Sequence, residues 1–438
     1  MPDCTVQGEL FGSVGRRRIE VGFDGGDVTS DAGLLLIRKA DEQIGLLNRV
    51  ASKLPDPRAP ERIEHSVVEL LRQRVYGLVQ GYEDLNDHDR LRHDLALQTA
   101  LGKVTPAASS PTLCRFEQRA DRALAGAIHE VILDRFIASF TAPPEELVLD
   151  FDATDDPVHG AQEGRFFHGY YDTYCFLPLY VFCGEQLLVS YLRPANIDAA
   201  KQAGAILKGL VQRLRAVWPS VRIVFRGDSG FCRRRILSWC ERHGVGYIVG
   251  LARNQRIERM AAWWMESAME AYALTGEGIR CFGELWYRAG TWAQPRRVIV
   301  KAEITKTAKA NPRFVVTNLT GDLRERYESD YCARGEMENR IKECQLGLFA
   351  DRTSCHRWWP NQFRMLIASL GYVLMQHLRC VALAGTELAT AQAGTIRAKL
   401  LKVGAVIVRN TRRIRFYVAS AFPLRHLFLA AAHGLNSG

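Results

Sequence analysis

The spacing of apolar residues predicts a mainly helical region over about the first third of the chain. In the segment PERIEHSVVELLRQRVYGLV, apolar side chains recur every three or four residues from Ile63 to Leu78, which is the period of an amphipathic helix. Pro143 and Pro144 then end the helical pattern, because proline lacks the backbone N–H that a helix interior requires. We therefore predict a helical N-terminal region over residues 1–145.

Beyond this region the pattern changes to short β-rich runs. LVLDFDA, YCFLPLYVFC and EQLLVSYLRP are rich in β-branched and aromatic residues and are separated by turn residues, so we expect an antiparallel meander. A helical period follows from Ala199 to Trp218, and strand, helix and strand patterns then alternate in VRIVFRGDSG, CRRRILSWCERHG and VGYIVGLA. The order βββαβαβ predicts a mixed α/β sheet with helices on its faces.

A second β-rich segment follows, with CFGELWYRAG, RRVIVKAEIT and PRFVVTNL separated by Gly, Pro and Asn. We interpret it as an insertion, and helix is expected to resume from Tyr331 and to dominate to the end of the chain. The predicted organisation is a helical N-terminal region (1–145), a first part of the α/β core (146–254), a β-rich insertion (255–325), a second part of the core (326–385) and a basic C-terminal region (386–438).

Composition and charge narrow the class of protein. The 438 residues are 47% hydrophobic and 24% charged, which is typical of globular proteins and excludes disordered and fibrous classes. Eleven cysteines, an odd number with no C-x-x-C pair, favour reduced thiols over a disulfide scaffold. No apolar run reaches the roughly 18 residues of a membrane helix, so we expect a soluble, cytoplasmic protein with no membrane partner.

The net charge favours a polyanionic partner. Lys and Arg number 58 and Asp and Glu number 48, so the formal charge is 58 − 48 = +10. No acidic residue follows Glu387, whereas eight cations do, a pattern that predicts salt-dependent binding to a phosphate backbone. Three of these cations are clustered and are candidate DNA contacts: Arg412, Arg413 and Arg415.

Carboxylates at the ends of predicted strands form a candidate metal site. Asp150 and Asp152 share parity in the first strand of the core and therefore project from the same face. Asp228 stands where the later apolar strand VRIVF ends. Such acids would repel one another unless a cation neutralised them, and hard oxygen ligands suit Mg²⁺ or Mn²⁺. Acids at strand ends are also common turn formers, so this pattern alone does not distinguish a metal site from ordinary turns.

A polar stripe on a predicted helix adds a third acid. At 100° per residue, five polar side chains of YCARGEMENRIKECQLGLF fall within about 80° of one another. They are Tyr331, Arg334, Glu338, Lys342 and Gln345. A Glu338–Lys342 pair one turn apart is sensible in any solvated helix, but it leaves Tyr331 and Arg334 unexplained.

These residues carry a resemblance to a known family. Tyr331, Arg334 and Glu338 have the Y-x₂-R-x₃-E spacing of the hairpin-forming, cut-and-paste branch of bacterial insertion-sequence transposases. LDFDATDDPVHG resembles the strand with the first aspartate of these DDE enzymes, and FRGDSGF resembles the strand with the second. The resemblance implies an RNase H-like core (βββαβαβ…α), interrupted by the β-rich insertion before the helix that carries the glutamate.

The resemblance also implies a site and a reaction. Asp152, Asp228 and Glu338 would hold two divalent ions, Mg²⁺ or Mn²⁺, for metal-dependent excision and strand transfer of a mobile element. Tyr331 and Arg334 would contact the end of the transferred strand. The family commonly has a lysine where this chain has Gln345, so Lys342 on the same face is the candidate substitute.

The partners implied are the double-stranded inverted-repeat ends of the element and a target DNA. The helical N-terminal region would contact the ends, and a homodimer would hold two ends in a synaptic complex at the bacterial nucleoid. Family members also flip a base and stack it on an aromatic ring, and Trp286 and Trp292 are candidates for this ring by position. Tryptophans in such positions are more often buried core residues.

Several alternatives remain open. Asp150 could be the first acid in place of Asp152, and Asp155 and Asp156 lie just beyond the strand. His159 and His168 lie near the expected site and could contact DNA or a metal, although a lone histidine more often packs or caps a loop. At the level of function, the competitors are a structure-selective DNA nuclease on the same core and a DNA-binding protein that has lost catalysis.

Overall fold

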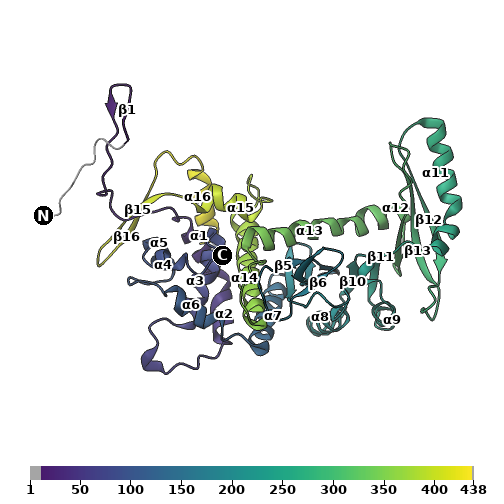
Figure 1. Cartoon of the computed structure of the whole chain (residues 1–438), viewed down its shortest axis with the longest axis horizontal. Helices are drawn as coiled ribbons and strands as arrows, with labels where there is room; N and C mark the ends of the chain where they lie inside the picture. Colours follow the sequence, from purple (N-terminus) through teal and green to yellow (C-terminus); the bar gives the residue numbers. More distant parts are fainter. Residues whose placement is uncertain (1–10, 437–438) are drawn as a thin grey trace. The chain divides into compact units, whose positions relative to one another are not determined.

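The computed structural model describes residues 11–436, and the chain folds into two compact units (Figure 1). The first unit combines the N-terminal segment up to Phe116 with the C-terminal segment from Leu374. The second unit is the continuous stretch Glu117–Val373. All three predicted acids therefore belong to the second unit, whereas the arginine cluster near the C-terminus belongs to the first.

The N-terminal segment of the first unit is mainly helical. A capping box starts its longest helix: the Ser66 hydroxyl accepts from the backbone N–H of Glu69, and the Glu69 carboxylate accepts from that of Ser66. The helices are α1 (Leu34–Ile44), α2 (Leu46–Ser52), α3 (Val67–Gln80), α4 (His88–Leu91), α5 (Leu95–Ala100) and α6 (Ser110–Glu117), after two short strands, β1 (Ser13–Val14) and β2 (Arg17–Arg18).

The C-terminal segment contains a β-hairpin that the apolar pattern does not predict, among the helices expected there. β15 (Ala405–Arg409) pairs antiparallel with β16 (Ile414–Val418), and β3 (Val28–Thr29) adds a third strand beside β15. The sequences AVIVR and IRFYV are rich in β-branched and aromatic residues, which favour strands. Short helices lie on either side of the hairpin in sequence, namely α15 (Ala393–Ile396) and α16 (Arg425–Gly434).

An eight-stranded mixed sheet forms the centre of the second unit. Its strand order is β12-β13-β14-β11-β10-β4-β8-β9, and β4, β10 and β11 are parallel to one another while every other neighbouring pair is antiparallel. The strands are β4 (Glu146–Ala153), β8 (Leu179–Cys183), β9 (Gln186–Tyr191), β10 (Arg222–Gly227), β11 (Gly246–Leu251), β12 (Ile279–Tyr287), β13 (Arg296–Ile304) and β14 (Arg313–Thr317). The predicted mixed α/β class is confirmed.

The segment predicted as a β-rich insertion extends this sheet. Val249 of β11 pairs with Val316 of β14, so the ladder of hydrogen bonds runs without interruption from the parallel strands into β14, β13 and β12. Two helices precede these strands, α10 (Gln255–Met260) and α11 (Ala262–Thr275). The strands β12, β13 and β14 therefore belong to the same sheet as β4, which carries Asp152, and β10, which Asp228 follows.

Helices cover one face of the sheet and a helical segment crosses the other. α8 (Ala203–Val217) and α9 (Arg234–Arg242) contribute Leu207, Leu214 and Leu237 to a buried cluster with Phe225 of β10. On the opposite face, Tyr327 packs on Val224, Ile248 and Val315 in a smaller cluster. The segment that carries Tyr327 therefore lies against the face from which residues 148, 150 and 152 project.

A small separate sheet interrupts the predicted meander. β5 (Asp156–Pro157), β7 (Thr173–Phe176) and β6 (Phe166–His168) pair in the order β5-β7-β6. The sequence pattern predicts one strand over YCFLPLYVFC, but the structure divides it into β7 and β8, which belong to different sheets. Pro178 lies between them and has no N–H to donate to a ladder, which accounts for the break.

The helix predicted from Tyr331 is not uniform. α12 (Leu323–Glu325) leads into a π-helical turn over Arg326–Tyr331, a 3₁₀ turn over Cys332–Arg334, α13 (Gly335–Lys342) and a second π-helical turn over Glu343–Gly347. The 100° step used to align the polar stripe therefore holds only within α13.

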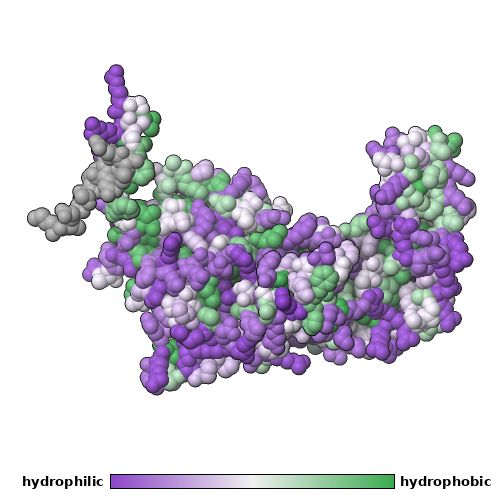
Figure 2. Space-filling view, viewed as in Figure 1, coloured by the Kyte–Doolittle hydropathy of each residue, from purple (hydrophilic) through white to green (hydrophobic). Residues whose placement is uncertain are grey.

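The longest helices are α7 (Arg122–Ile137), in the second unit, and α14 (Trp358–Ala382), which belongs to the second unit as far as Val373. By length and composition alone α14 could cross a membrane, but 83% of its most apolar stretch is buried inside the protein, as in the core helix of a globular fold. Figure 2 shows mainly hydrophilic side chains on the visible face of the molecule.

Candidate active site

The three predicted acids line one cavity of about 580 Å³ at the carboxyl ends of β4 and β10. Open α/β sheets commonly bind ligands at this edge of their parallel strands. Asp152 comes from β4, Asp228 follows β10 directly, and Glu338 comes from α13. The other polar side chains that line the cavity are Thr154, Asp155, His168, Tyr170, Tyr171, Arg334, Lys342 and Gln345.

Local backbone geometry places Asp228 at the cavity. Its carboxylate accepts a hydrogen bond of 2.8 Å from the backbone N–H of Gly230 and caps the short 3₁₀ turn Ser229–Phe231. The neighbouring strand β11 leaves room for this turn, because a Cβ at Gly250 would lie 2.8 Å from the Ser229 nitrogen and 2.6 Å from the Tyr331 hydroxyl oxygen. The glycine thus allows both the aspartate turn and the Tyr331 ring to approach the sheet.

Arg334 lies between two of the acids. Its Nη1 is 3.5 Å from Asp152 Oδ2, and its Nη2 is 3.2 Å from Glu338 Oε1. The side chains of Asp152 and Arg334 are both largely buried, whereas that of Glu338 is half exposed. One guanidinium group therefore links the first strand of the core to the helix that carries the third acid.

The electrostatics of the cavity favour a bound cation. Burial raises the pKa of Asp152 to about 7, Arg334 opposes the rise, and the nearby carboxylates of Asp228 and Glu338 add to it. Burial also raises the pKa of Tyr171 to about 12, with contributions from Asp155 and Asp152. A cation placed among the acids would favour the charged form of Asp152 and offset its repulsion by Asp228 and Glu338.

The acids fit a divalent metal by chemistry more than by spacing. Their oxygen donors suit Mg²⁺ or Mn²⁺. In the part of the chain that the structure describes, however, no three His, Cys, Asp or Glu side chains come close enough together to hold a metal ion. Arg334 supplies the positive charge between Asp152 and Glu338, so ion binding would require these side chains to rearrange around it.

Asp150 is engaged elsewhere and does not line the cavity. Both of its carboxylate oxygens accept hydrogen bonds from Arg226 of β10, and the two residues are register partners across β4 and β10. Arg226 also donates to the backbone carbonyl of Asp330 at 2.5 Å. Burial raises the pKa of Asp150, and Arg226 opposes the rise. Arg226 was not identified as a functional candidate from the sequence. Its position two residues before Asp228 is the sequence feature that could have indicated it.

Asp155 and Asp156, which follow β4, also differ in whether they line the cavity. Asp155 lines the cavity, whereas Asp156 is fully buried and accepts a hydrogen bond of 2.9 Å from the Thr353 hydroxyl. Burial raises the pKa of Asp156 well above its ordinary range, and Asp351 and Asp155 contribute. Asp156 therefore lies in the protein interior and not at the cavity.

The polar stripe divides into three different settings. Arg334, Glu338, Lys342 and Gln345 line the cavity, and the Gln345 amide donates to the backbone carbonyl of Asp155 at 2.9 Å. Tyr331 does not line it, since its hydroxyl points toward Gly250 of β11. Burial raises the pKa of Tyr331. Lys342 is thus placed to face a ligand, whereas Gln345 is fixed to the cavity wall.

The two candidate tryptophans lie far from the acids. Trp292 is 4% exposed and packs in the core against Tyr287, with ring centroids 5.7 Å apart. Trp286 is 62% exposed, but the register puts it five strands away from Asp150 in the same row of the sheet, roughly 24 Å at ~4.8 Å per strand.

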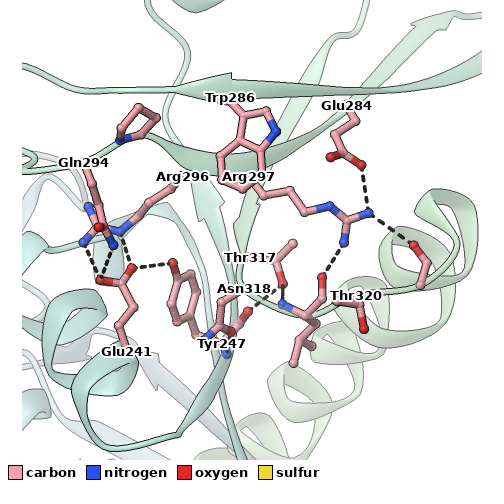
Figure 3. Close-up of a pocket in the computed structure, with 13 residues that line it drawn as sticks. Glu241, Tyr247, Glu284, Trp286, Gln294, Arg296, Arg297, Thr317, Asn318 and Thr320 are labelled. Atoms are coloured by element: carbon pink, nitrogen blue, oxygen red, sulfur yellow. Dashed lines mark hydrogen bonds and ion pairs between the residues drawn. The ribbon is translucent and has the colours of Figure 1, made fainter.

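Trp286 lies instead over a second cavity of about 460 Å³ (Figure 3). At one end of it Arg297 pairs with Glu284 at 3.0 Å, and at the other Arg296 pairs with Glu241 at 2.6 Å. Both arginines at this cavity are thus already paired with carboxylates.

The predicted DNA-contacting arginines of the first unit lie on the β15–β16 hairpin. Arg412 and Arg413 occupy its turn, where the Asn410 side chain accepts hydrogen bonds from both of their backbone N–H groups. All three arginines are exposed, and their side chains form no ion pair with the residues that the structure describes. Arg415 makes one contact, a hydrogen bond of 3.4 Å to the Tyr417 hydroxyl.

Comparison with known proteins gives a family match over nearly the whole chain. The family model described as transposase DDE domain group 1 matches residues 11–437. Among solved structures, the chain is similar to the piggyBac transposase in a synaptic complex with hairpin DNA, with 12% identity, a TM-score of 0.40, and coverage of 85% of this chain and 80% of that one. No curated protein matches. On the extent of the family match, the chain belongs to the DDE-domain transposases of group 1.

Proposed function

We propose that the protein is a metal-dependent DNA transposase that excises an insertion sequence and joins it to a target, through a DNA hairpin intermediate. Asp152, Asp228 and Glu338 are its catalytic acids. The observation that carries the proposal is that these residues, 76 and 110 positions apart in sequence, line one cavity with a guanidinium group between two of them.

The order of strands supports an RNase H-like core. Parallel strands β4, β10 and β11 stand beside the antiparallel pair β8 and β9, with α8 and α9 as crossovers on one face. This arrangement follows the predicted order βββαβαβ. In such a core the acids belong at the ends of the first and fourth strands and on a later helix, as Asp152, Asp228 and Glu338 do.

We assign the metal sites to the same three acids. Asp152, Asp228 and Glu338 would hold two Mg²⁺ or Mn²⁺ ions, which activate the attacking oxygen and stabilise the leaving oxygen in phosphodiester cleavage. Arg334 keeps the carboxylates together before the ions bind. Once released from Asp152 and Glu338, its planar guanidinium suits a phosphate of the strand end.

We assign the remaining basic residues to contacts with the DNA backbone. Lys342 faces the cavity and contacts a backbone phosphate there, in place of the lysine that the family pattern has at Gln345. Tyr331 packs beside Arg334 and steadies it. In the first unit, Arg412, Arg413 and Arg415 bind the phosphate backbone of duplex DNA, and the N-terminal helical region contacts the terminal repeats.

The partners are the inverted-repeat ends of a mobile element and its target DNA, held by a homodimer in a synaptic complex. Both ends of an element must be cut together, so two active sites have to be assembled at once. The protein would act at the nucleoid in the bacterial cytoplasm.

Cleavage of the element's own ends tests this function. Linear DNA that carries the sequences flanking the gene is incubated with the protein and Mg²⁺ or Mn²⁺, and the products are separated on native and denaturing gels. We expect excision with a covalently closed hairpin on the excised fragment, and we expect Asp228→Asn to abolish cleavage while it still binds the ends. Asp150→Asn tests the alternative first acid.

Two other results would point to the competing functions. Cleavage of branched DNA of arbitrary sequence, with no preference for the ends, indicates a structure-selective nuclease. Binding of the ends without any nick in either metal indicates a DNA-binding protein that has lost catalysis.

A further inference from the structure

Exposed aromatic side chains gather on the β6–β7 hairpin of the second unit. Phe167 is 52% exposed, Tyr174 is 50% exposed, and Tyr170, in the loop between the strands, is 85% exposed. Large apolar patches on a protein surface usually mark a binding site. This one lies on a segment of fewer than 15 residues that is inserted between β4 and β8.

The aromatic surface begins at the wall of the acid cavity. His168, Tyr170 and Tyr171 line the same cavity as Asp152, Asp228 and Glu338. The Tyr171 ring lies between the other two, with its centroid 5.0 Å from that of Tyr170 and 4.9 Å from that of His168. A ligand strand that leaves the cavity on this side therefore meets aromatic rings first.

A cation accompanies the rings on the outer face of the hairpin. Phe167 and Tyr174 are register partners with ring centroids 5.6 Å apart, and the Arg165 guanidinium carbon lies 4.8 Å from the centroid of Tyr174. Arg165 makes no ion pair with any described residue. Aromatic faces together with an unpaired cation are what single-stranded nucleic acid requires, since the bases stack and the phosphates need counter-charge.

The hairpin is anchored, so the exposed rings are held in place. Cys175 and Phe176 on β7 are fully buried, and Phe176 packs edge-to-face on Trp358 of α14 with centroids 5.4 Å apart. Gly164, just before β6, has φ +82°, and its position lies against the same tryptophan ring. The exposed rings thus lie on a hairpin that is held in place by the buried end of β7 and by the packing around Gly164.

We infer that the β6–β7 hairpin binds unpaired nucleotides next to the scissile phosphate, with bases stacked on Tyr170 and on the Phe167–Tyr174 pair and a phosphate bound by Arg165. The inference rests on the proposed function, because it takes DNA to be the ligand of the acid cavity. A duplex would hide the base faces that the rings require, so the occupant is a single-stranded end. This assigns stacking to the hairpin and not to Trp286 or Trp292.

Binding of matched DNA ends tests the inference without any cleavage step. The probes are a blunt duplex of the element's end and the same duplex with three unpaired nucleotides that include 2-aminopurine, titrated in EDTA with anisotropy and 2-aminopurine fluorescence as readouts. Wild-type protein should bind the unpaired end more tightly and quench the fluorophore. Tyr170→Ala and Phe167→Ala should each weaken that binding on the order of 10-fold and leave blunt-duplex binding unchanged.

Two further variants make the result specific. Tyr170→Phe should bind as the wild type does, because stacking needs the ring and not the hydroxyl. Trp263→Ala, which removes an aromatic ring that is 67% exposed on α11, is the matched control and should change neither affinity. Equal affinity of the wild type for both probes, an equal loss of both with Tyr170→Ala, or a loss with Trp286→Ala instead would overturn the inference.

The failure of the inference can be told from the failure of the proposed function. If the wild type cuts the element's ends while the hairpin variants bind unpaired DNA normally, only the stacking site is refuted. If the wild type never cuts, the preference for unpaired ends and its dependence on Tyr170 still decide whether the hairpin binds single strands.

Discussion

Arg226 donates hydrogen bonds to both carboxylate oxygens of Asp150 across the neighbouring strands β10 and β4. Asp150 lies two residues before Asp152, and Arg226 lies two residues before Asp228. The third contact of the same guanidinium is the carbonyl of Asp330, on the helical segment that leads to Glu338. One buried side chain therefore ties together the three segments that carry the acids.

The variant Arg226→Lys should impair the positioning of the acids without weakening the binding of the DNA ends. Lysine keeps the charge but cannot form the bidentate contact or reach Asp330 at the same time, so we expect cleavage to fall on the order of 10²-fold while affinity for the ends stays within about 2-fold. The Mg²⁺ concentration for half-maximal cleavage should rise, and stability should fall by about 3 kcal/mol in urea denaturation.

The same strand offers a control for this variant. Arg222 lies 3.4 Å from Glu146 across the same two strands, but its side chain is exposed, so Arg222→Lys should change neither cleavage nor stability measurably. Unchanged metal dependence in Arg226→Lys, with stability alone reduced, would limit Arg226 to a role in folding.

The raised pKa of Asp152 predicts a pH dependence of stability. Between about pH 4 and pH 7 the folded, metal-free protein keeps a proton that the unfolded chain has released, so stability falls as pH rises through this range. The Asp152→Asn variant should not lose stability in this way, because the asparagine side chain does not titrate. At pH 8 it should be more stable than the wild type by up to about 4 kcal/mol, and at pH 4 the gain should vanish.

Urea denaturation of both proteins at the two pH values, in EDTA, measures this difference. Cleavage by the wild type should rise with pH through about 7, as Asp152 becomes able to bind a metal. The same stability difference at pH 4 and pH 8 would contradict the assigned cause.

Removal of Arg334 should make the acids more available to metal ions. The guanidinium group competes with a divalent ion for Asp152 and Glu338, so Arg334→Gln should bind Mn²⁺ several-fold more tightly in isothermal titration calorimetry without DNA. The titration belongs at pH 8.5, because the loss of Arg334 raises the pKa of Asp152 further.

A neighbouring arginine on the same helix is the control. Arg340 pairs with Glu336 at 3.1 Å and does not line the acid cavity, so Arg340→Gln should leave Mn²⁺ affinity unchanged. We expect Arg334→Gln to lose cleavage despite its tighter metal binding. Weaker Mn²⁺ binding at pH 8.5 would show that Arg334 supports the site and does not compete for it.

The exposed arginines of the β15–β16 hairpin should make the affinity for duplex DNA depend on salt concentration. Replacing Arg412, Arg413 and Arg415 with alanine should reduce the slope of log K against log salt for duplex DNA by up to about 3, since each lost phosphate contact removes about 0.9. Fluorescence anisotropy between 50 and 200 mM KCl, concentrations chosen for the assay, gives the slope. Arg409→Gln is the control, because Arg409 already donates to Gln98. An unchanged slope in the triple variant would remove the hairpin from the DNA interface.

The sequence predicts the mixed α/β class and three acids that the structure places along one cavity, because both predictions depend on local patterns. Apolar runs that end in Asp152 or Asp228 predict strand ends, and the period of α13 places Glu338 and Lys342 on one face. The partner of Asp150 could not be predicted, since strand parity gives its face and not the register that brings Arg226 beside it. The π-helical turns near α13 were not predicted either, because the helical period was assumed to be a uniform 100° per residue.

The C-terminal strands were missed for a different reason. Ala405–Arg409 and Ile414–Val418 are short and lie within a region whose neighbours are helical, so the apolar period alone does not distinguish them from helix. Pairing with β3, nearly 400 residues earlier in the chain, completes their sheet, and a contact of that range has no local signal.

The order of the elements along the chain places Glu338 after the strands β12, β13 and β14 that extend the sheet beyond β11. β14 pairs with β11, and the segment that follows β14 carries Glu338. A nascent polypeptide that has emerged only as far as β11 contains Asp152 and Asp228 but not yet Glu338, so on the proposed function it would hold two of the three catalytic acids and could not cut DNA.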